Sequence, residues 1–268
     1  MDFRDQVVVI TGASNGIGRR LALDLTAKGA VVVGCGRSQE RLQQLLKEMR
    51  LTSSASTVFV CDVSDPAQVT SMIGKTLAEF GRIDILINNA GIGMRQPFAE
   101  MSLETVAEIM RTNYFGTVYC THEVLPSMIA RGSGHIVNIS SGAGKIGSPN
   151  MAAYCASKFA INGLSESLYH ELKPLGIDVS VVCPGPVRTE FNRLFADNQP
   201  KSPASLVIAP EAVSRAVIRV IETKKFELVM PRWLALMCWV KRMMPNLFRI
   251  VFHHTFRAYV RGQKNHHA

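Results

Sequence analysis

Apolar residues in this chain gather in short runs of strand length, which alternate with longer stretches of helical periodicity. Strands rich in Val and Ile are expected at residues 6–10, 30–35, 57–61, 83–88, 135–140, 177–183 and 226–230. Helices are expected between them at residues 16–28, 38–50, 65–80, 102–130, 152–173 and 210–223. Continuous Val and Ile runs indicate strands that are buried on both faces, as in parallel sheets. The alternation therefore predicts an α/β fold with a doubly wound, mostly parallel sheet of about seven strands.

This alternation continues without a linker or an internal repeat as far as residue 230. We therefore expect a single domain over residues 1–230, which is long enough to bury a sizeable core. Two regions do not follow the alternation of strands and helices. Residues 190–209 contain Pro200 and Pro203 and follow the sixth strand, and residues 231–268 form a basic and apolar C-terminal extension.

The formal net charge of +9 is concentrated in this extension. It holds seven Lys or Arg residues and no Asp or Glu, whereas residues 1–230 hold 23 basic and 21 acidic residues. The basic residues of the extension are Arg232, Lys241, Arg242, Arg249, Arg257, Arg261 and Lys264. Because the body is almost neutral, we expect no nucleic-acid partner.

The extension combines its positive charge with aromatic and apolar side chains. Residues 233–244 are rich in Trp, Leu and Met, and Pro245 separates them from a second apolar stretch at 247–252. Such a pair of basic helices is typical of the interface of an anionic membrane, which predicts peripheral membrane contact through residues 232–257. The alternative is an extension that covers the substrate pocket or packs on a second subunit. No uninterrupted apolar run reaches the length of about 18 residues that would predict a membrane-spanning helix.

The six cysteines are scattered without a CxxC pair or the spacing of metal ligands. Most lie in apolar runs, which is typical of reduced, buried thiols, so we expect neither disulfides nor a metal site. The first residues lack the basic and apolar regions of a signal peptide. These features predict a cytoplasmic protein. The C-terminal extension adds the alternative that the protein attaches peripherally to a membrane surface.

A glycine-rich turn, TGASNGIG at residues 11–18, follows the first expected strand and opens the first expected helix. Glycines at such a position allow a tight turn and a close approach of the backbone to phosphate, while the helix N-terminus offers free N–H groups. This turn predicts a dinucleotide site. Its candidate cofactor-binding residues are Gly12, Ser14, Asn15, Gly16, Ile17 and Gly18.

The end of the second expected strand indicates which dinucleotide is preferred. Arg37 and Ser38 stand where an acidic residue would bind the adenosine ribose hydroxyls, and the next acidic residue is Glu40. A guanidinium can hold a 2′-phosphate with two hydrogen bonds, whereas a carboxylate would repel it. We therefore expect NADP(H) rather than NAD(H); the alternative is that Arg37 is only a solvated residue at the start of a helix.

Five motifs together resemble those of the short-chain dehydrogenase/reductase family. They are the glycine-rich turn at 11–18, NNAG at 88–91, ISS at 139–141, YCASK at 154–158 and PGPVRT at 184–189. Their order and spacing are similar to those of the family over about residues 5–230. The resemblance implies a Rossmann-type domain and hydride transfer between a nicotinamide cofactor and a carbonyl or alcohol substrate.

The resemblance also implies roles for four catalytic residues. Tyr154 is expected to protonate the carbonyl oxygen, and Lys158, one helical turn further on, to lower the pKa of this phenol from its usual value near 10 and to hold the nicotinamide ribose. Ser141 resembles the hydroxyl that polarises the carbonyl, and the spacing favours it over Ser140. Asn113 resembles the residue whose backbone holds a water between Lys158 and solvent.

Further cofactor contacts follow from the same resemblance. Asp62 is similar to the residue that accepts the adenine amino group, with Val63 beside the ring. The segment that lines the cofactor with its backbone is expected to be Asn89, Ala90 and Gly91. The segment that fixes the nicotinamide face is expected to be Pro184, Gly185, Val187 and Thr189.

The region after the sixth strand indicates an apolar substrate. It contains Phe191, Leu194, Phe195, Leu206, Val207 and Ile208, and Met94, Phe98 and Met151 are expected to add apolar lining. These side chains predict a ketone or alcohol such as a 3-oxoacyl or other long-chain 3-oxo lipid; the alternative is a loop that packs its apolar side on the core.

A hydroxysteroid or retinoid dehydrogenase is a second interpretation, and an NADPH-binding sensor or scaffold at a membrane surface is the non-enzymatic one. The family resemblance further implies a homo-oligomer that pairs through the long helices beside the sheet.

Overall fold

The structure, a computed structural model, describes residues 2–190 and 204–264 of the chain. Its centre is a seven-stranded sheet in which all neighbouring strands are parallel. The strands are β1 (Val7–Thr11), β2 (Val31–Gly36), β3 (Thr57–Val60), β4 (Ile85–Asn88), β5 (Gly134–Ile139), β6 (Ile177–Pro184) and β7 (Glu227–Met230). Each lies within one or two residues of a strand expected from the sequence.

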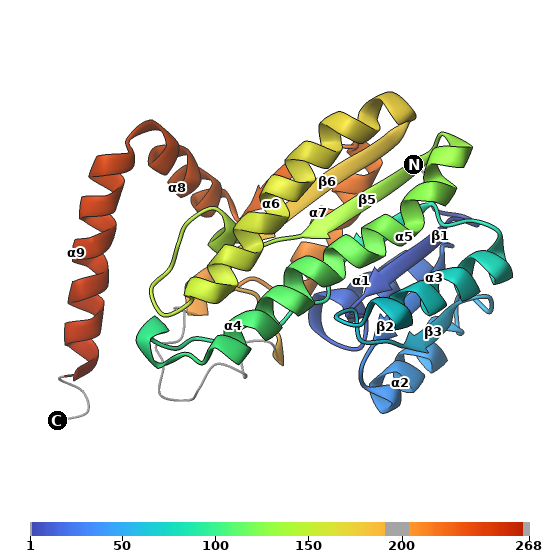
Figure 1. Cartoon of the computed structure of the whole chain (residues 1–268), viewed down its shortest axis with the longest axis horizontal. Coiled ribbons are helices and arrows are strands. Elements are labelled where there is room, and N and C mark those ends of the chain that lie inside the picture. The colour runs from blue at the N-terminus through green and yellow to red at the C-terminus, as the bar shows by residue number, and fades with distance from the viewer. Residues whose placement is uncertain (1, 191–203, 265–268) are drawn as a thin grey trace.

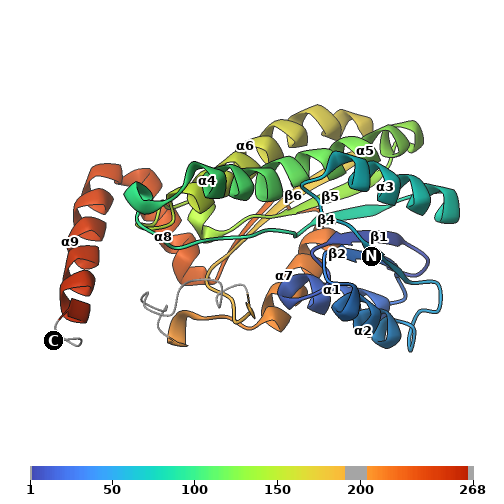
Figure 2. The same cartoon turned by 60° about the horizontal axis from the view of Figure 1, so that its bottom comes forward.

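The strand order, β3-β2-β1-β4-β5-β6-β7, reverses between β1 and β4, which confirms the doubly wound Rossmann sheet. Figures 1 and 2 show the two helical layers that cover it. One layer contains α1 (Gly16–Thr26), α2 (Gln39–Met49) and α7 (Pro210–Thr223), and the other contains α3 (Pro66–Phe80), α4 (Leu103–Met110), α5 (Gly116–Arg131) and α6 (Ala152–Leu172). Short 3₁₀ turns lie at Phe98–Glu100, Gly142–Gly144, Lys173–Leu175 and Ala204–Leu206.

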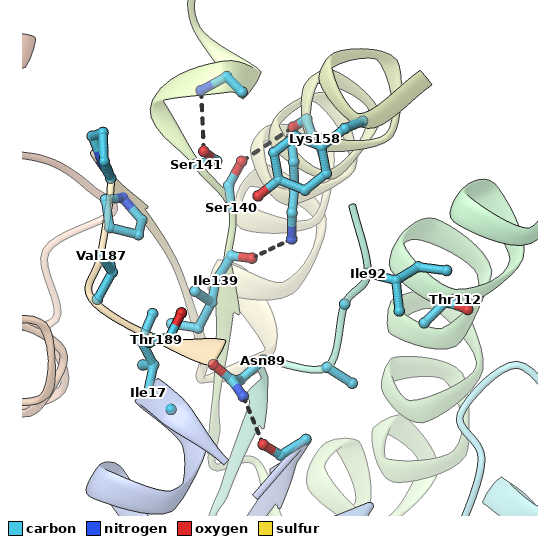
Figure 3. Close-up of a pocket in the computed structure, with 18 of the residues that line it drawn as sticks. Ile17, Asn89, Ile92, Thr112, Ile139, Ser140, Ser141, Lys158, Val187 and Thr189 are labelled. Carbon is cyan, nitrogen blue, oxygen red and sulfur yellow. Dashed lines mark hydrogen bonds between the residues drawn. The ribbon is translucent and has the colours of Figure 1, made fainter. Parts of the chain in front are cut away.

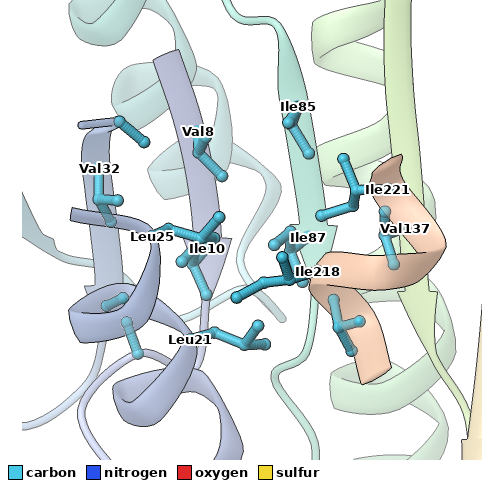
Figure 4. Close-up of a cluster of buried hydrophobic side chains, with 14 of the residues drawn as sticks. Val8, Ile10, Leu21, Leu25, Val32, Ile85, Ile87, Val137, Ile218 and Ile221 are labelled. Atoms are coloured by element: carbon cyan, nitrogen blue, oxygen red, sulfur yellow. The ribbon is translucent and has the colours of Figure 1, made fainter. Parts of the chain in front are cut away.

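Alternate side chains of each strand pack under different helical layers, because successive residues of a strand point to opposite faces. Val8 and Ile10 of β1 pack with Leu21 of α1 and Ile221 of α7, as Figure 4 shows. Val9, their neighbour on the strand, belongs to the cluster under α3 and α5. The continuous apolar runs of the sequence therefore serve two cores, one on each face of the sheet.

Local sequence signals determine where α3 starts and stops. The side chain of Asp65 accepts hydrogen bonds from the backbone N–H groups of Ala67 and Gln68, and Pro66 occupies the first helical position. The helix ends at Gly81, whose φ of 72° is the left-handed conformation that glycine adopts at little cost. The helix expected at residues 65–80 is thereby confirmed.

The helix expected at residues 102–130 is present, but a π-helical turn at Arg111–Phe115 interrupts it between α4 and α5. The π-helical turn places the side chain of Asn113 inside the protein. There it is fully buried and forms two hydrogen bonds with the backbone of Ile92. These long-range bonds form across 21 residues. Hydrophobic periodicity carries no signal for them, so only the folded chain identifies the interruption.

The C-terminal extension forms the predicted pair of helices, α8 (Arg232–Met243) and α9 (Pro245–Lys264), with Pro245 at the break between them. Figure 1 shows α8 leaving the end of the sheet and α9 standing apart from the body. Within the described residues, neither these nor the other helices combine the length and apolar character needed to cross a membrane.

Candidate active site

The glycine-rich turn between β1 and α1 forms the floor of the site. Gly12 has φ of 65°, and a Cβ atom on it would lie 2.8 Å from the Cα atom of Ala90. Gly16 has φ of 56° and lies against the side chain of Thr189. The amide of Asn89 fixes the turn by donating to the backbone oxygens of Thr11 (2.9 Å) and Gly12 (3.2 Å). At the N-terminus of α1 the two glycines therefore expose the backbone of the turn, as phosphate binding requires.

Gly18 packs closely beneath the glycine-rich turn, and its expected contact with the cofactor stays a prediction. It is buried beneath the turn, and a Cβ atom on it would lie 2.4 Å from the backbone oxygen of Gly12. The residue therefore allows α1 to pack against the turn that contains Gly12. It does not line the cavity above that turn.

A cavity of about 870 Å³ lies above this floor at the carboxyl ends of the strands. This is the side of an open α/β sheet at which ligands bind, beside the strand-order reversal. The predicted site residues that line it are Gly12, Ser14, Asn15, Gly16, Ile17, Arg37, Ser38, Asp62, Val63, Asn89, Ala90, Gly91, Ser141, Tyr154, Lys158, Pro184, Gly185, Val187 and Thr189. Figure 3 shows part of this lining.

Ser141, Tyr154 and Lys158 meet at one wall of the cavity. The hydroxyls of Ser141 and Tyr154 form a hydrogen bond, and the Nζ atom of Lys158 lies 5.8 Å from the centre of the Tyr154 ring. This Nζ donates to the backbone oxygen of Ile139 at 2.9 Å, as Figure 3 shows. Ser140 instead donates to the backbone oxygen of Lys158 and is 3% exposed. The preference for Ser141 over its neighbour therefore agrees with the side-chain directions.

The pKa of Tyr154 departs from the sequence expectation. Burial raises this pKa to about 12, because a phenolate loses its hydration inside the protein, and the hydrogen bond with Ser141 offsets only part of that cost. The expected lowering by Lys158 does not outweigh burial in this geometry. The ammonium is directed to Ile139, so its charge does not bear directly on the phenol oxygen.

Burial acts on Lys158 in the opposite direction. It is 4% exposed, and loss of hydration lowers the pKa of its ammonium to about 8. An ordinary lysine would hold its proton firmly at neutral pH. Lys158 can therefore release and regain a proton within about a unit of neutrality, which suits a group that passes protons to a neighbouring phenol.

Asn113 lies behind the cavity wall and does not line it. Its Nδ2 atom donates to Ser157 Oγ at 2.9 Å, and its backbone oxygen accepts a 2.8 Å hydrogen bond from Thr117. Its side chain thus connects the π-helical turn to α6 one residue before Lys158. The predicted role of its backbone in a water chain stays a prediction.

The far end of the cavity contains the residues that follow β2. Arg37 is exposed there, beside Ser38. Arg41, which the sequence reading missed, also lines this end and pairs with Glu190 at 2.6 Å. Glu190 also accepts a 2.7 Å hydrogen bond from Asn15, so it connects the glycine-rich turn, α2 and the segment after β6. Arg41 and Glu190 are 149 positions apart in the sequence, so no local pattern predicts their contact.

The apolar lining differs from the one expected. Met151 lines the cavity, whereas Met94 packs against a small separate core, Ile208 packs against the core beneath the sheet, and Phe98 is 61% exposed. Phe191, Leu194 and Phe195 lie outside the described residues. The cavity instead takes apolar side chains from Ile92, Ala143, Ile146, Trp233, Leu234, Met237 and Phe252. Four of these come from the C-terminal helices. Of the alternatives given for the extension, the structure therefore supports the one in which it covers the pocket.

Comparison with known proteins agrees with this geometry. The short chain dehydrogenase family profile matches residues 6–200. Dehydrogenase/reductase SDR family member 7B of Danio rerio is 38% identical over 241 residues, which cover 85% of this chain and 78% of that protein. The chain belongs to the short-chain dehydrogenase/reductase family. Another member, the ketoacyl reductase HetN of a Nostoc strain, is 35% identical over 84% of this chain and 78% of its own length.

Solved structures of the family share the fold and differ in their cofactor. A short-chain dehydrogenase/reductase from Burkholderia phymatum in complex with NAD has a TM-score of 0.83 and 26% identity, with coverage of 92% of this chain and 96% of that one. A metagenomic short-chain oxidoreductase in complex with NADP has a TM-score of 0.73 and 32% identity, covering 86% and 98%. Membership of the family therefore supports an oxidoreductase, and the two neighbours bind different dinucleotides, NAD in one structure and NADP in the other.

Proposed function

We propose that this protein is an NADP(H)-dependent oxidoreductase that interconverts a carbonyl and a secondary alcohol on an apolar substrate. One observation carries the proposal. Ser141 and Tyr154 are joined by a hydrogen bond at the wall of the cavity, with the buried amine of Lys158 behind them. A protein that only bound the dinucleotide would gain nothing from burying an ammonium whose pKa falls to about 8.

The residues of the turn fit the cofactor, since Gly12 and Gly16 leave a bare backbone at the N-terminus of α1. A reduced nicotinamide bound on this turn would supply the hydride that the carbonyl carbon needs. Ser141 then donates a hydrogen bond to the carbonyl oxygen, and Tyr154 gives its proton to that oxygen as negative charge develops. Lys158 returns a proton to the resulting phenolate, for which Asn113 and its π-helical turn form the proposed route from solvent.

The preference for NADP(H) rests on the charges at the adenosine end. Arg37 and Arg41 bring two guanidinium groups to this end, of which Arg41 is paired with Glu190. Arg37 has the position and the exposure to meet a 2′-phosphate. A hydrogen bond to a charged group contributes about 1.5–3 kcal/mol, equivalent to roughly a ten- to hundredfold preference.

We propose a long-chain 3-oxo lipid, such as a 3-oxoacyl compound, as the substrate. The inner cavity wall has apolar side chains from Met151 and from α8, and the similarity to a ketoacyl reductase supports the same class. A hydroxysteroid or retinoid is the second candidate, because an apolar wall also accepts a rigid ring system. We further propose a homo-oligomer paired through α5 and α6, and a cytoplasmic protein with peripheral membrane contact through residues 232–257.

The test is NADPH oxidation by the full-length chain with a panel of apolar ketones that includes 3-oxoacyl thioesters, 3-oxosteroids and retinal. Turnover with the oxoacyl compounds is expected, and Tyr154→Phe is expected to abolish it while NADPH affinity in calorimetry stays near that of the wild type. No NADPH oxidation with any compound of the panel, together with tight NADPH binding, would favour the sensor or scaffold instead. Residual activity of Tyr154→Phe above a few per cent of wild type would remove Tyr154 as the proton donor.

A further inference from the structure

Helix α8 has two apolar faces with different surroundings. Leu236, Trp239 and Met243 are 61%, 59% and 52% exposed, and their spacing of three and four residues places them on one side of the helix. Leu234 and Met237 lie on the opposite side and line the cavity. At about 100° per residue the exposed three fall within about 60° of each other. The exposed stripe is therefore a separate surface from the wall of the site.

Helix α9 repeats this arrangement. Leu247, Ile250 and Val251 are 49%, 58% and 56% exposed and lie on one side of the helix. Phe248 and Phe252 lie on another side, where their rings stack with centroids 5.6 Å apart, and Phe252 lines the cavity. Each helix thus presents an apolar stripe to the outside and an apolar wall to the cavity. We call the six exposed side chains of α8 and α9 the outer stripe.

Contacts with the turn after Ser141 fix α8 on the body. Leu234 is 6% exposed and fills the space that a side chain at Gly142 would need, since a Cβ atom there would lie 2.6 Å from Leu234 Cδ2. Lys241 donates to the backbone oxygen of Lys145, and its amine lies 5.2 Å from the centre of the Phe159 ring. The helix that carries the outer stripe is therefore packed directly on the segment that positions the catalytic serine.

The charges around the outer stripe indicate what covers it. Residues 231–268 contain seven Lys or Arg and no acidic residue, and Arg232, Arg242 and Arg249 are exposed beside the stripe. A second copy placed symmetrically on this face would bring two such positive segments together, which costs free energy. A surface of anionic phospholipid attracts them and accepts the apolar side chains among its acyl chains. Tryptophan, at position 239, is a side chain that favours this interface.

We propose that the outer stripe of α8 and α9 docks on an anionic bilayer, so that apolar substrate enters the cavity from the membrane between the two helices. The docking surface is independent of the proposed reaction. The entry of substrate rests on the proposed function, because it requires an apolar compound that dissolves in the bilayer. Figure 1 shows α9 separated from the sheet and its flanking helices, and each side chain of the outer stripe is about half exposed or more.

The chain has a built-in reporter for this docking, because its two tryptophans both lie in α8. Trp233→Phe leaves Trp239, in the outer stripe, as the single fluorophore. Vesicles of phosphatidylserine and phosphatidylcholine that carry bromine on their acyl chains are expected to quench Trp239 and shift its emission to shorter wavelength. Vesicles of phosphatidylcholine alone are expected to quench it much less, and added salt is expected to weaken the quenching.

Substitutions in the same Trp233→Phe background test the stripe itself. Leu236→Glu combined with Ile250→Glu places two carboxylates at the proposed interface, and at least about tenfold weaker vesicle binding is expected. The control is Leu51→Glu, because Leu51 lies in the turn after α2, is 85% exposed and is remote in sequence from α8 and α9. It is expected to bind vesicles as the parent does. Because all three leucine and isoleucine side chains are more than half exposed, the folded state is expected to survive, and circular dichroism checks it.

Three outcomes overturn the proposal: no quenching by anionic brominated vesicles, equal binding by the double variant, or equal loss with Leu51→Glu. A change of oligomeric mass in the double variant, without a change in vesicle binding, would assign the stripe to a second copy instead. None of these measurements uses turnover. Vesicle binding with no activity would therefore remove the proposed reaction and keep the docking surface, while activity without vesicle binding would do the reverse.

Discussion

Replacing Lys158 by methionine is expected to make the cofactor-free protein more stable and to abolish its turnover. The lysine is 4% exposed, and burial lowers the pKa of its ammonium from the usual 10.5 to about 8. At pH 7 the group is charged in both the folded and the unfolded state, so folding bears the cost of removing this charge from water. Methionine fills a similar length without a charge.

The magnitude follows from these two pKa values. They differ by about 2.5 pKa units, and each unit corresponds to about 1.4 kcal/mol, so burying the ammonium costs about 3.5 kcal/mol at pH 7. The substitution also removes the hydrogen bond to the backbone oxygen of Ile139, which contributes about 1 kcal/mol. A net gain of about 2.5 kcal/mol remains. For a chain of this size that gain raises Tm by about 5–10 °C.

The gain must also depend on pH with a definite sign. Between about pH 8 and pH 10.5 the unfolded lysine still holds its proton while the folded lysine has lost it. The unfolded state binds more protons there, so the free energy of unfolding of the wild type rises with pH across this interval. The advantage of Lys158→Met is therefore complete below about pH 8 and is lost as the pH approaches 10.5.

Urea denaturation of both proteins at pH 7 and at pH 10, without cofactor, measures this difference. Effects common to all other ionisable groups cancel when the variant is compared with the wild type at each pH. Lys75→Met is the matched control, because Lys75 is exposed on α3 and little change is expected from it. Lower or equal stability of Lys158→Met at pH 7, or a gain that does not shrink at pH 10, would refute the argument.

Two further predictions concern the cofactor site. Arg37→Asp is expected to lower the NADPH-to-NADH ratio of kcat/KM by about ten- to a hundredfold, because a carboxylate repels the 2′-phosphate. Arg50 is also exposed on this side of the sheet, and Arg50→Asp should leave the ratio unchanged. An unchanged ratio in both variants would show that another residue determines the cofactor preference. Gly18→Ala is expected to cost about 1–3 kcal/mol of stability and to weaken dinucleotide binding in calorimetry, because the new methyl group would lie 2.4 Å from the backbone oxygen of Gly12. Gly74→Ala, with nothing within 4 Å of the added carbon, should instead gain about 1 kcal/mol from helix propensity, and equal effects of the two substitutions would contradict the close packing.

Local patterns were enough to predict much of the fold. Short apolar runs rich in Val and Ile identified the seven strands of the sheet, and the helical stretch at residues 65–80 identified α3, whose ends are fixed in the structure by Asp65, Pro66 and Gly81. The glycine-rich turn and the Tyr154–Lys158 pair were readable for the same reason. Their chemistry depends on residues a few positions apart, which one turn or one helix brings together.

Contacts between distant segments were not readable. The π-helical turn around Asn113, the contact of Glu190 with Arg41 and the raised pKa of Tyr154 each depend on groups that only folding brings together. The pKa is the clearest case. A lysine four residues away suggested a lower value from spacing alone, whereas burial, which no local pattern reports, raises it.

The sequence by itself determined the parallel sheet, the family and most of the motif residues that line the cavity, because each is encoded in local periodicity or in a short motif. The tertiary structure decided how deeply Tyr154 and Lys158 are buried and which side chains enclose the cavity. It gave part of the cavity wall to α8 and α9, where Leu234 packs on the turn after Ser141 from a position 93 residues later in the chain. Solvation and long-range packing are properties of the assembled chain, since they depend on every segment that excludes water from the same space.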